Sequence, residues 1–219
     1  MKLDFLQIMP SLPFILEGAI VTLKYTVLSV FFGFLIGGAL GLMKVSHLRF
    51  LEIFARVYTS IFRGTPLLVQ LMFVYFALPQ IINYKITAFE AGVLAFSLNS
   101  GAYVSEIIRS GILSVDRGQF EAAASLGISY FLTMKDIILP QAIKNILPAL
   151  VNETVNLLKE SALVSTIGEM DLLRRANTIA AEKYIYFEPL LIVAVIYYLL
   201  VVTLSCFANI LEVRLRRHD

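Results

Sequence analysis

The sequence predicts an all-α membrane protein with five transmembrane helices and one short helix between the third and the fourth. Hydrophobic residues make up 58% of its 219 residues and charged residues only 16%, and the mean hydropathy is +0.81. A soluble domain carries about a quarter charged residues. Apolar stretches long enough to cross the ~30 Å hydrocarbon core recur along the chain, and no Gly/Ser-rich or Pro-rich linker divides it. We therefore expect a single membrane domain over residues 1–219.

The charge, the cysteine content and the motifs exclude several functions. A formal net charge of +2 is too mild for a nucleic-acid partner, and a lone cysteine, Cys206, cannot form an intrachain disulfide. No Gly-x-x-x-x-Gly-Lys phosphate loop is present, so we do not expect the chain to hydrolyse ATP. The two histidines, His47 and His218, lie in no metal-ligand cluster and offer no Ser-His-Asp site. We expect no catalytic residue, metal or cofactor in this chain.

The N-terminal part of the chain predicts an interfacial segment followed by a first span. Residues 1–17 mix apolar residues with polar residues and two prolines, which favours a segment that lies along the membrane interface. The span covers about 19–43. Small residues recur on one of its faces, namely Gly33, Gly37 and Gly41, with Gly38 beside them. This spacing predicts that another helix packs closely against that face.

A second span is predicted at about 57–82, after a short polar loop in which we interpret His47 as an interfacial residue. The run Arg63-Gly64-Thr65-Pro66 interrupts its helical pattern. Pro66 has no amide donor and disfavours helical geometry at Thr65. We therefore expect a kink or an unwound turn there.

The third span, about 87–108, has polar residues near its middle. Glu90 and Glu106 bracket the span, and Asn99 and Tyr103 lie one turn apart on one face. Lipid cannot satisfy polar groups at that depth, so they must face protein or a water-filled path. Asn99 and Tyr103 therefore either belong to a substrate pathway or bind neighbouring helices.

Segment 114–140 predicts a short helix with defined ends. Asp116 can cap its start, with Gln119 three residues later as in a capping box, and Gly127 stands where a left-handed cap would end it. About ten residues are too few to span a bilayer. Glu121 stands beside small side chains that would let a partner's groove close around the helix, namely Ala122, Ala123, Ala124 and Ser125. We expect a partner to contact Asp116, Glu121, Ala122, Ala123 and Gly127.

This segment also carries a longer motif. Glu-Ala-Ala, three residues, Gly, nine residues and Ile-x-Leu-Pro are matched at Glu121, Ala122, Ala123, Gly127, Ile137, Leu139 and Pro140. The motif resembles the cytoplasmic coupling motif of permease subunits of ATP-binding-cassette importers. The runs Tyr103–Gln119, Arg63–Pro66 and Lys159–Gly168 resemble the subfamily that imports polar amino acids, and the resemblance covers nearly the whole chain. It implies a type I importer permease fold.

The fourth span, about 137–158, has the most polar membrane face. A charge at the bilayer centre costs at least ~2.5 kcal/mol, so Glu153 is a functional candidate, although an internal ion pair or hydrogen-bonded strut is the alternative. We assign to a substrate pathway Asn99, Tyr103, Asn152, Glu153, Asn156, Lys159, Glu160 and Ser161. Residues 161–188 carry mixed charges and predict a solvated loop, which could also contact a substrate-delivery protein. A fifth span covers about 189–211.

The distribution of Lys and Arg predicts the orientation. With the N-terminus outside, the inner loops and tail contain Lys44, Arg49, Arg56, Arg109, Arg117, Lys135, Arg214, Arg216 and Arg217. The outer segments then contain Lys2, Lys85, Lys159, Arg174, Arg175 and Lys183. This bias favours an N-terminus outside a bacterial or archaeal cell membrane and a cytoplasmic C-terminus. Segment 114–140 would then face the cytoplasm.

The resemblance implies an assembly of two permeases and two ATPases, with ATP and Mg on the ATPase subunits. The second permease would be another copy of this chain, which we favour, or a paralogue, and an extracellular binding protein would deliver the amino acid. Glu153 could neutralise a cationic side chain, so we favour a basic amino acid over glutamine or another polar one. Lys159 could meet the substrate carboxylate or pair with a nearby acid. A non-transporting scaffold or sensor, and an ATP-independent channel or secondary transporter, are the alternatives.

Overall fold

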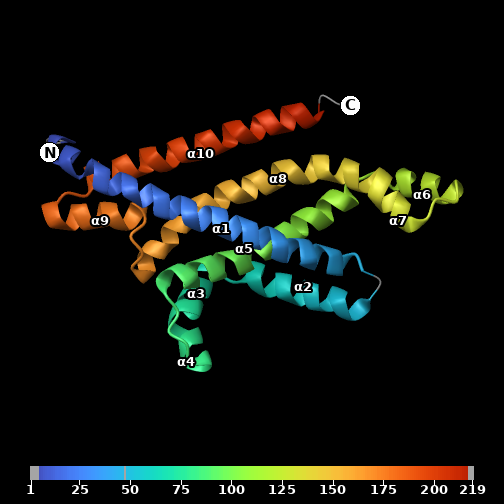
Figure 1. Cartoon of the computed structure of the whole chain (residues 1–219), viewed down its shortest axis with the longest axis horizontal. Helices are drawn as coiled ribbons and strands as arrows, with labels where there is room; N and C mark the ends of the chain where they lie inside the picture. Colours follow the sequence, from blue (N-terminus) through green and yellow to red (C-terminus); the bar gives the residue numbers. More distant parts are fainter. Residues whose placement is uncertain (1–4, 47, 217–219) are drawn as a thin grey trace.

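The computed structural model describes residues 5–46 and 48–216, with side chains described up to residue 210. These residues form helices and turns, and no strand occurs among them. Five long helices run roughly along one direction (Figure 1), namely α1 (Leu12–Lys44), α2 (Arg49–Gly64), α5 (Ala88–Leu113), α8 (Leu139–Glu160) and α10 (Phe187–Arg216). The expectations for Lys2, His47 and Arg217 fall outside the described residues.

Length and apolar composition identify most of the predicted spans. Within the described residues, three helical stretches are long and apolar enough to cross a membrane, namely Phe5–Lys44, Ala88–Leu113 and Phe187–Ile210. The bent pair Arg49–Gly64 and Leu67–Ile82 counts as a fourth if it is one span. α8 has the length of a span, and its polar residues explain why it does not pass the same test of apolarity. It nevertheless packs along α1, α5 and α10.

The predicted close packing of the glycine face is confirmed. A Cβ atom added at Gly37 would lie 2.5 Å from the Cβ of Val104, and one at Gly33 would lie 2.8 Å from the Cβ of Ser100. At Gly41 the nearest atom, on Ile108, is 3.1 Å away, whereas Gly38 has nothing within 4 Å. The glycine face of α1 therefore lies directly against α5, because any side chain there would hold the two backbones apart.

An ion pair joins the same two helices near one end. The Nζ of Lys44 lies 2.6 Å from Oε1 of Glu106 and donates to the Ser105 hydroxyl at 2.8 Å, and the Lys44 side chain is 1% exposed. Arg109 binds the other oxygen of Glu106 at 2.8 Å. Lys44 and Glu106 are 62 residues apart. Sequence spacing therefore could not pair them.

The predicted interruption at Pro66 is confirmed and is larger than a kink. α2 ends at Gly64, and the helical stretch that follows is bent from it by 101°. This stretch comprises α3 (Leu67–Met72), a π-helical turn at Phe73–Ala77 and α4 (Leu78–Ile82). α2 starts at Arg49, eight residues before the predicted start of that span. The bend sends α3 and α4 away from the direction of the long helices (Figure 1).

The structure changes the bounds of the predicted N-terminal segment, and it contradicts the loop predicted at 161–188. Part of the proposed interfacial segment 1–17 belongs to α1, which begins at Leu12 after two 3-10 turns at Phe5–Gln7 and Met9–Ser11. The buried residue Ile8 packs against α9 (Leu172–Lys183), with Leu172 and Ala176 in the same apolar cluster.

The expected loop 161–188 contains a 3-10 turn at Ser161–Ile167 and a helix, α9 (Leu172–Lys183). Asp171 caps α9 by accepting a hydrogen bond from the Arg174 amide at 2.8 Å. Apolar residues recur at helical spacing on one face of α9, and all of them are buried, namely Leu172, Ala176, Ile179 and Ala180. The mixed charges on the other face obscured that pattern.

Candidate coupling helix and substrate pathway

The short helix α6 (Arg117–Ser125) forms where the sequence predicts it. Asp116 caps its start, because its Oδ1 accepts a hydrogen bond from the Gly118 amide at 2.7 Å. The cap differs from the expected capping box, since the Gln119 amide donates to the Asp116 carbonyl and not to its side chain. Gly127 has a φ of +72°, and the helix ends in a Schellman motif. In that motif the Gly127 amide donates to Ala124 and the Ile128 amide to Ala123, both at 3.0 Å.

α6 presents most of its small side chains outwards, with one exception. Glu121, Ala122, Ala124 and Ser125 are exposed. Ala123 is 2% exposed and faces its own chain, so the expectation that it lies on the outer surface was wrong. The period of 3.6 residues turns one position in this run inwards, and only the tertiary structure shows which one.

Large apolar side chains lie exposed beside α6. Leu126 is 78% exposed, and in the next helix, α7 (Tyr130–Leu132), Phe131 is 72% exposed. α6 and α7 are too short to span a bilayer, and large exposed apolar groups mark contact sites. The sequence analysis did not single them out, although apolar residues beside Gly127 in a non-spanning segment were a usable signal.

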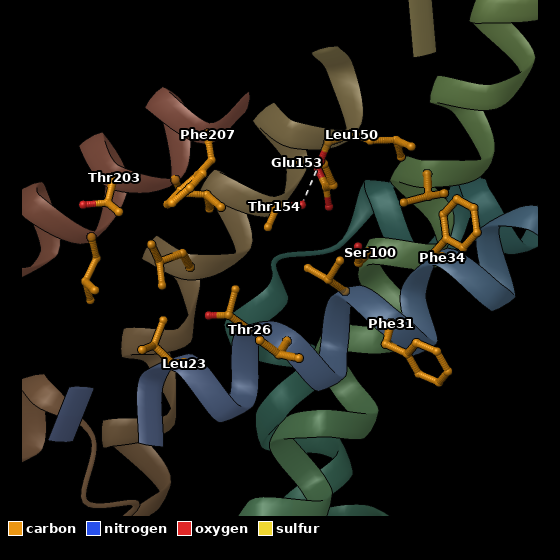
Figure 2. Close-up of a pocket in the computed structure, with 16 residues that line it drawn as sticks. Leu23, Thr26, Phe31, Phe34, Ser100, Leu150, Glu153, Thr154, Thr203 and Phe207 are labelled. Atoms are coloured by element: carbon orange, nitrogen blue, oxygen red, sulfur yellow. Dashed lines mark hydrogen bonds between the residues drawn. The ribbon is translucent and has the colours of Figure 1, made fainter. Parts of the chain in front are cut away.

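The residues assigned to the substrate pathway occupy separate places. Glu153 lines a groove of about 680 Å³ between α1, α5, α8 and α10 (Figure 2). The other polar residues on this groove are Thr26, Ser100, Thr154 and Thr203. Ser100 is 1% exposed. The rest of the lining is apolar.

The C-terminal end of α8 faces a second groove. Asn156, Lys159 and Glu160 line this space of about 380 Å³, and Asn152 is exposed on the same helix. Ser161 is fully buried, and its hydroxyl donates to the Leu158 carbonyl at 2.7 Å, so it does not line either groove. The polar face predicted on α8 is therefore divided between different surroundings.

The third-span candidates lie elsewhere again. Asn99 is 4% exposed and donates to the Phe62 carbonyl and to Gln70, which corresponds to the helix-binding alternative. Tyr103 lies under the guanidinium of Arg63, 5.2 Å from its ring centroid, and both line a groove of about 430 Å³ with Asn145. Sequence reasoning missed Asn145 and Gln70. Asn145 continues the stripe of Asn152 towards the start of α8 by two turns, which was a readable signal.

Comparison with known proteins defines the family. The family model described as "Binding-protein-dependent transport system inner membrane component" matches residues 29–217. The chain belongs to this family. Permeases of the family work in ATP-binding-cassette importers with an ATPase and a substrate-binding protein, and they are generally not ATPases themselves.

Individual permeases are similar over almost their whole length. A protein of Rickettsia felis, provisionally named a glutamine transport system permease protein, is 60% identical over 93% of both chains. The arginine transport system permease protein of Bacillus subtilis is 52% identical over 100% of both. A crystal structure of an amino acid ABC transporter with histidines contains a chain that is 48% identical, with a TM-score of 0.93, over 98% of this permease and 100% of that chain.

More distant structures share the fold of this permease. A methionine ABC transporter in inward-facing conformations has a chain with a TM-score of 0.80 and 20% identity, over 94% of this chain and 98% of its own. The predicted type I importer permease fold is confirmed.

Proposed function

We propose that this permease subunit of a polar amino acid ABC importer provides an alternating-access path and favours a basic amino acid. The observation that carries the choice of substrate is the position of Glu153. Among the described residues that line the groove between α1, α5, α8 and α10, Glu153 alone is charged. A carboxylate inside a membrane bundle is costly and marks a functional site by default.

A basic amino acid fits this arrangement because its cationic side chain would neutralise Glu153. A charge-assisted hydrogen bond of this kind is about twice as strong as a neutral one. Glutamine or another polar amino acid is the alternative. The relatives' names include both arginine and glutamine, so the names do not decide between the two substrates. The choice of a basic amino acid rests on Glu153.

The assembly that we propose contains two copies of this chain and two ATPase subunits, which hold ATP and Mg and hydrolyse ATP. Closure of the ATPases would move the α6 helices and re-expose the path. ATP binding can shift this equilibrium only by binding one conformation more tightly than the other. α6 lies at the end of the molecule opposite the N-terminus (Figure 1). An N-terminus outside the cell would therefore bring α6 to the cytoplasmic ATPase.

Reconstitution tests the proposed function. Vesicles that contain this chain, its ATPase and its binding protein should accumulate amino acid only when ATP is present. Absence of uptake would favour a scaffold or sensor that uses the same ATPase contact, and uptake without ATP would favour a channel or secondary transporter.

The substrate assignment has its own test. Glu153→Gln should reduce uptake of arginine, lysine and histidine more than uptake of glutamine, because only the charge is removed. Glu52→Gln, which changes a carboxylate on α2 that pairs with the exposed Arg56 outside this groove, is the matched control and should change neither. Equal loss for both substrate classes would indicate a structural role for Glu153, and no loss would remove it from the path.

A further inference from the structure

The break after α2 leaves backbone carbonyls without their usual partners. In an unbroken helix the Phe62 carbonyl would accept a hydrogen bond from the amide of residue 66, but that residue is Pro66 and has no N–H. Thr65 has a φ of −120° and a ψ of 143°, so the chain there is extended. The Thr65 hydroxyl donates back to the Ile61 carbonyl at 2.9 Å. The Phe62 carbonyl must therefore accept hydrogen bonds from other groups.

Two side-chain amides supply these donors. The Nε2 of Gln70, in α3, donates to the Phe62 carbonyl at 2.8 Å, and the Nδ2 of Asn99, in α5, donates to it at 3.0 Å. Gln70 Nε2 also lies 3.1 Å from the Thr65 carbonyl and 2.8 Å from its hydroxyl. Asn99 Nδ2 lies 3.1 Å from Oε1 of Gln70. Gln70 thus connects α3 to the end of α2, and Asn99 connects both of them to α5.

The location makes these hydrogen bonds significant. Asn99 is near the middle of a membrane-spanning helix and is 4% exposed. In hydrocarbon an unpaired carbonyl costs several kcal/mol, and irregular backbone at that depth is tolerated only when protein groups or a wet cavity satisfy it. The bend that gives the Phe62 carbonyl its hydrogen bonds is therefore strongly preferred over other bends at the same position.

We propose that the amides of Gln70 and Asn99 replace the donor that Pro66 removes, and that they thereby set the angle between α2 and α3. Gln70 and Asn99 act as positioning residues through the last turn of α2. Phe62 precedes Arg63, whose guanidinium lies over Tyr103 in the groove shared with Asn145. Holding the Phe62 carbonyl holds Arg63 in that groove, and it makes α3 and α4 move together with α5.

The direct test measures the bend. Spin labels at Phe50 in α2 and Ile81 in α4, which are 78% and 69% exposed, report the distance across it in a Cys206→Ser background. Gln70→Met keeps the length of the side chain but removes its donors. We expect the distance distribution to become broader or to shift, because the variant loses the hydrogen bonds from α3 to Phe62 and Thr65. A distribution identical to that of the unsubstituted chain would overturn the proposal.

Gln80→Met is the matched control. Gln80 also donates to a main-chain carbonyl, that of Phe76 at 3.0 Å, but inside one helical stretch and away from the break. Gln80→Met should leave the distance distribution unchanged. Equal broadening in Gln80→Met and Gln70→Met would overturn the proposal. Asn99→Leu, which removes the second donor, should broaden the distribution as well. If Asn99→Leu does not fold, Gln70→Met alone decides the outcome.

A second substitution separates the role of the donors from general packing. Pro66→Ala restores an amide at residue 66 and frees Thr65 to become helical. Gln70→Met should lower the thermal unfolding temperature less in the Pro66→Ala chain than in the unsubstituted chain. The bend between α2 and α3 should not be restored in the double variant. An equal loss of stability in both backgrounds would mean that Gln70 does not substitute for the missing donor.

The consequence for transport rests on the proposed function. In vesicles, Gln70→Met should lower the maximal uptake rate several-fold with little change in KM, because it changes the shape of the path and not a substrate contact. An unchanged maximal rate would overturn the transport part of the inference. If the unsubstituted chain supports no ATP-driven uptake, the proposed function fails, and the distance measurement still decides the role of Gln70.

Discussion

At the scale of single residues, backbone geometry constrains α6 most strongly at its end. Gly127 holds a φ of +72°, and the two hydrogen bonds that close the helix depend on that conformation. A residue with a Cβ branch is strained there, and the left-handed conformation costs roughly 1–2 kcal/mol for residues other than glycine. The end of α6 is therefore sensitive to one substitution that removes no side-chain contact.

Gly127→Val should loosen the end of α6 and weaken copurification of the ATPase, while the long helices stay inserted. The measurements are ATPase recovery and hydrogen exchange at the Ile128 amide, which donates to Ala123. Gly127→Asn is the control at the same site, because Asn tolerates the left-handed region better. Full ATPase recovery and unchanged exchange with Val would contradict the expected role of the cap.

Ala123 shows how a residue-scale expectation changes with its surroundings. A bulky residue at an outward-facing position would block a partner's groove, but Ala123 is 2% exposed within its own chain. A large side chain there would displace α6 from its support instead. The exposed positions Ala122 and Ala124 are the better sites for testing contact with the ATPase.

At the scale of elements, the contact between α1 and α5 depends on missing side chains. Gly37 and Gly38 are neighbours in sequence, yet a Cβ at Gly37 would meet Val104 at 2.5 Å and a Cβ at Gly38 would meet nothing within 4 Å. Both substitutions to alanine gain the same helix propensity, about 1 kcal/mol relative to glycine. Any difference between them therefore reports the steric contact.

Gly37→Ala should lower the thermal unfolding temperature of the purified protein in detergent, whereas Gly38→Ala should leave it unchanged or raise it. Overpacking of this kind typically costs about 1–3 kcal/mol. An equal effect of both substitutions would mean that α1 and α5 do not approach as closely at Gly37 as the structure shows.

At the scale of the whole molecule, the long helices separate two ends with different elements. One end carries the N-terminus and α9, and the other carries α6, α7 and the end of α10 (Figure 1). The Lys/Arg distribution predicts that the second end is cytoplasmic. This orientation decides which partner each end can meet.

Single cysteines test the orientation in a Cys206→Ser background, because Cys206 is itself exposed. A cysteine at Gln119 should react with impermeant reagents only from the cytoplasmic side, and one at Lys85 only from outside. Both positions are exposed, so a lack of reaction on one side reports the membrane barrier and not burial. The reverse labelling pattern would overturn the predicted orientation.

Local features were readable from the sequence because their causes lie within a turn or two of the chain. The cap at Asp116, the reversal at Gly127 and the break at Pro66 follow from the backbone chemistry of single residues, and the glycine face of α1 follows from helical spacing. The helix α9 was missed, and a loop was predicted in its place, because mixed charges on one face obscured the apolar repeat on the other.

Tertiary structure alone decided the features that join distant residues. Asn99 and Phe62 are 37 residues apart and Lys44 and Glu106 are 62 apart, so no local pattern could pair them. The sequence marked Asn99 as a polar group that needed a partner in the membrane, but the folded helices determined that its partner is a carbonyl freed by Pro66. The same physical requirement, that no polar group stays unpaired in lipid, identified the residue in the sequence and its role in the structure.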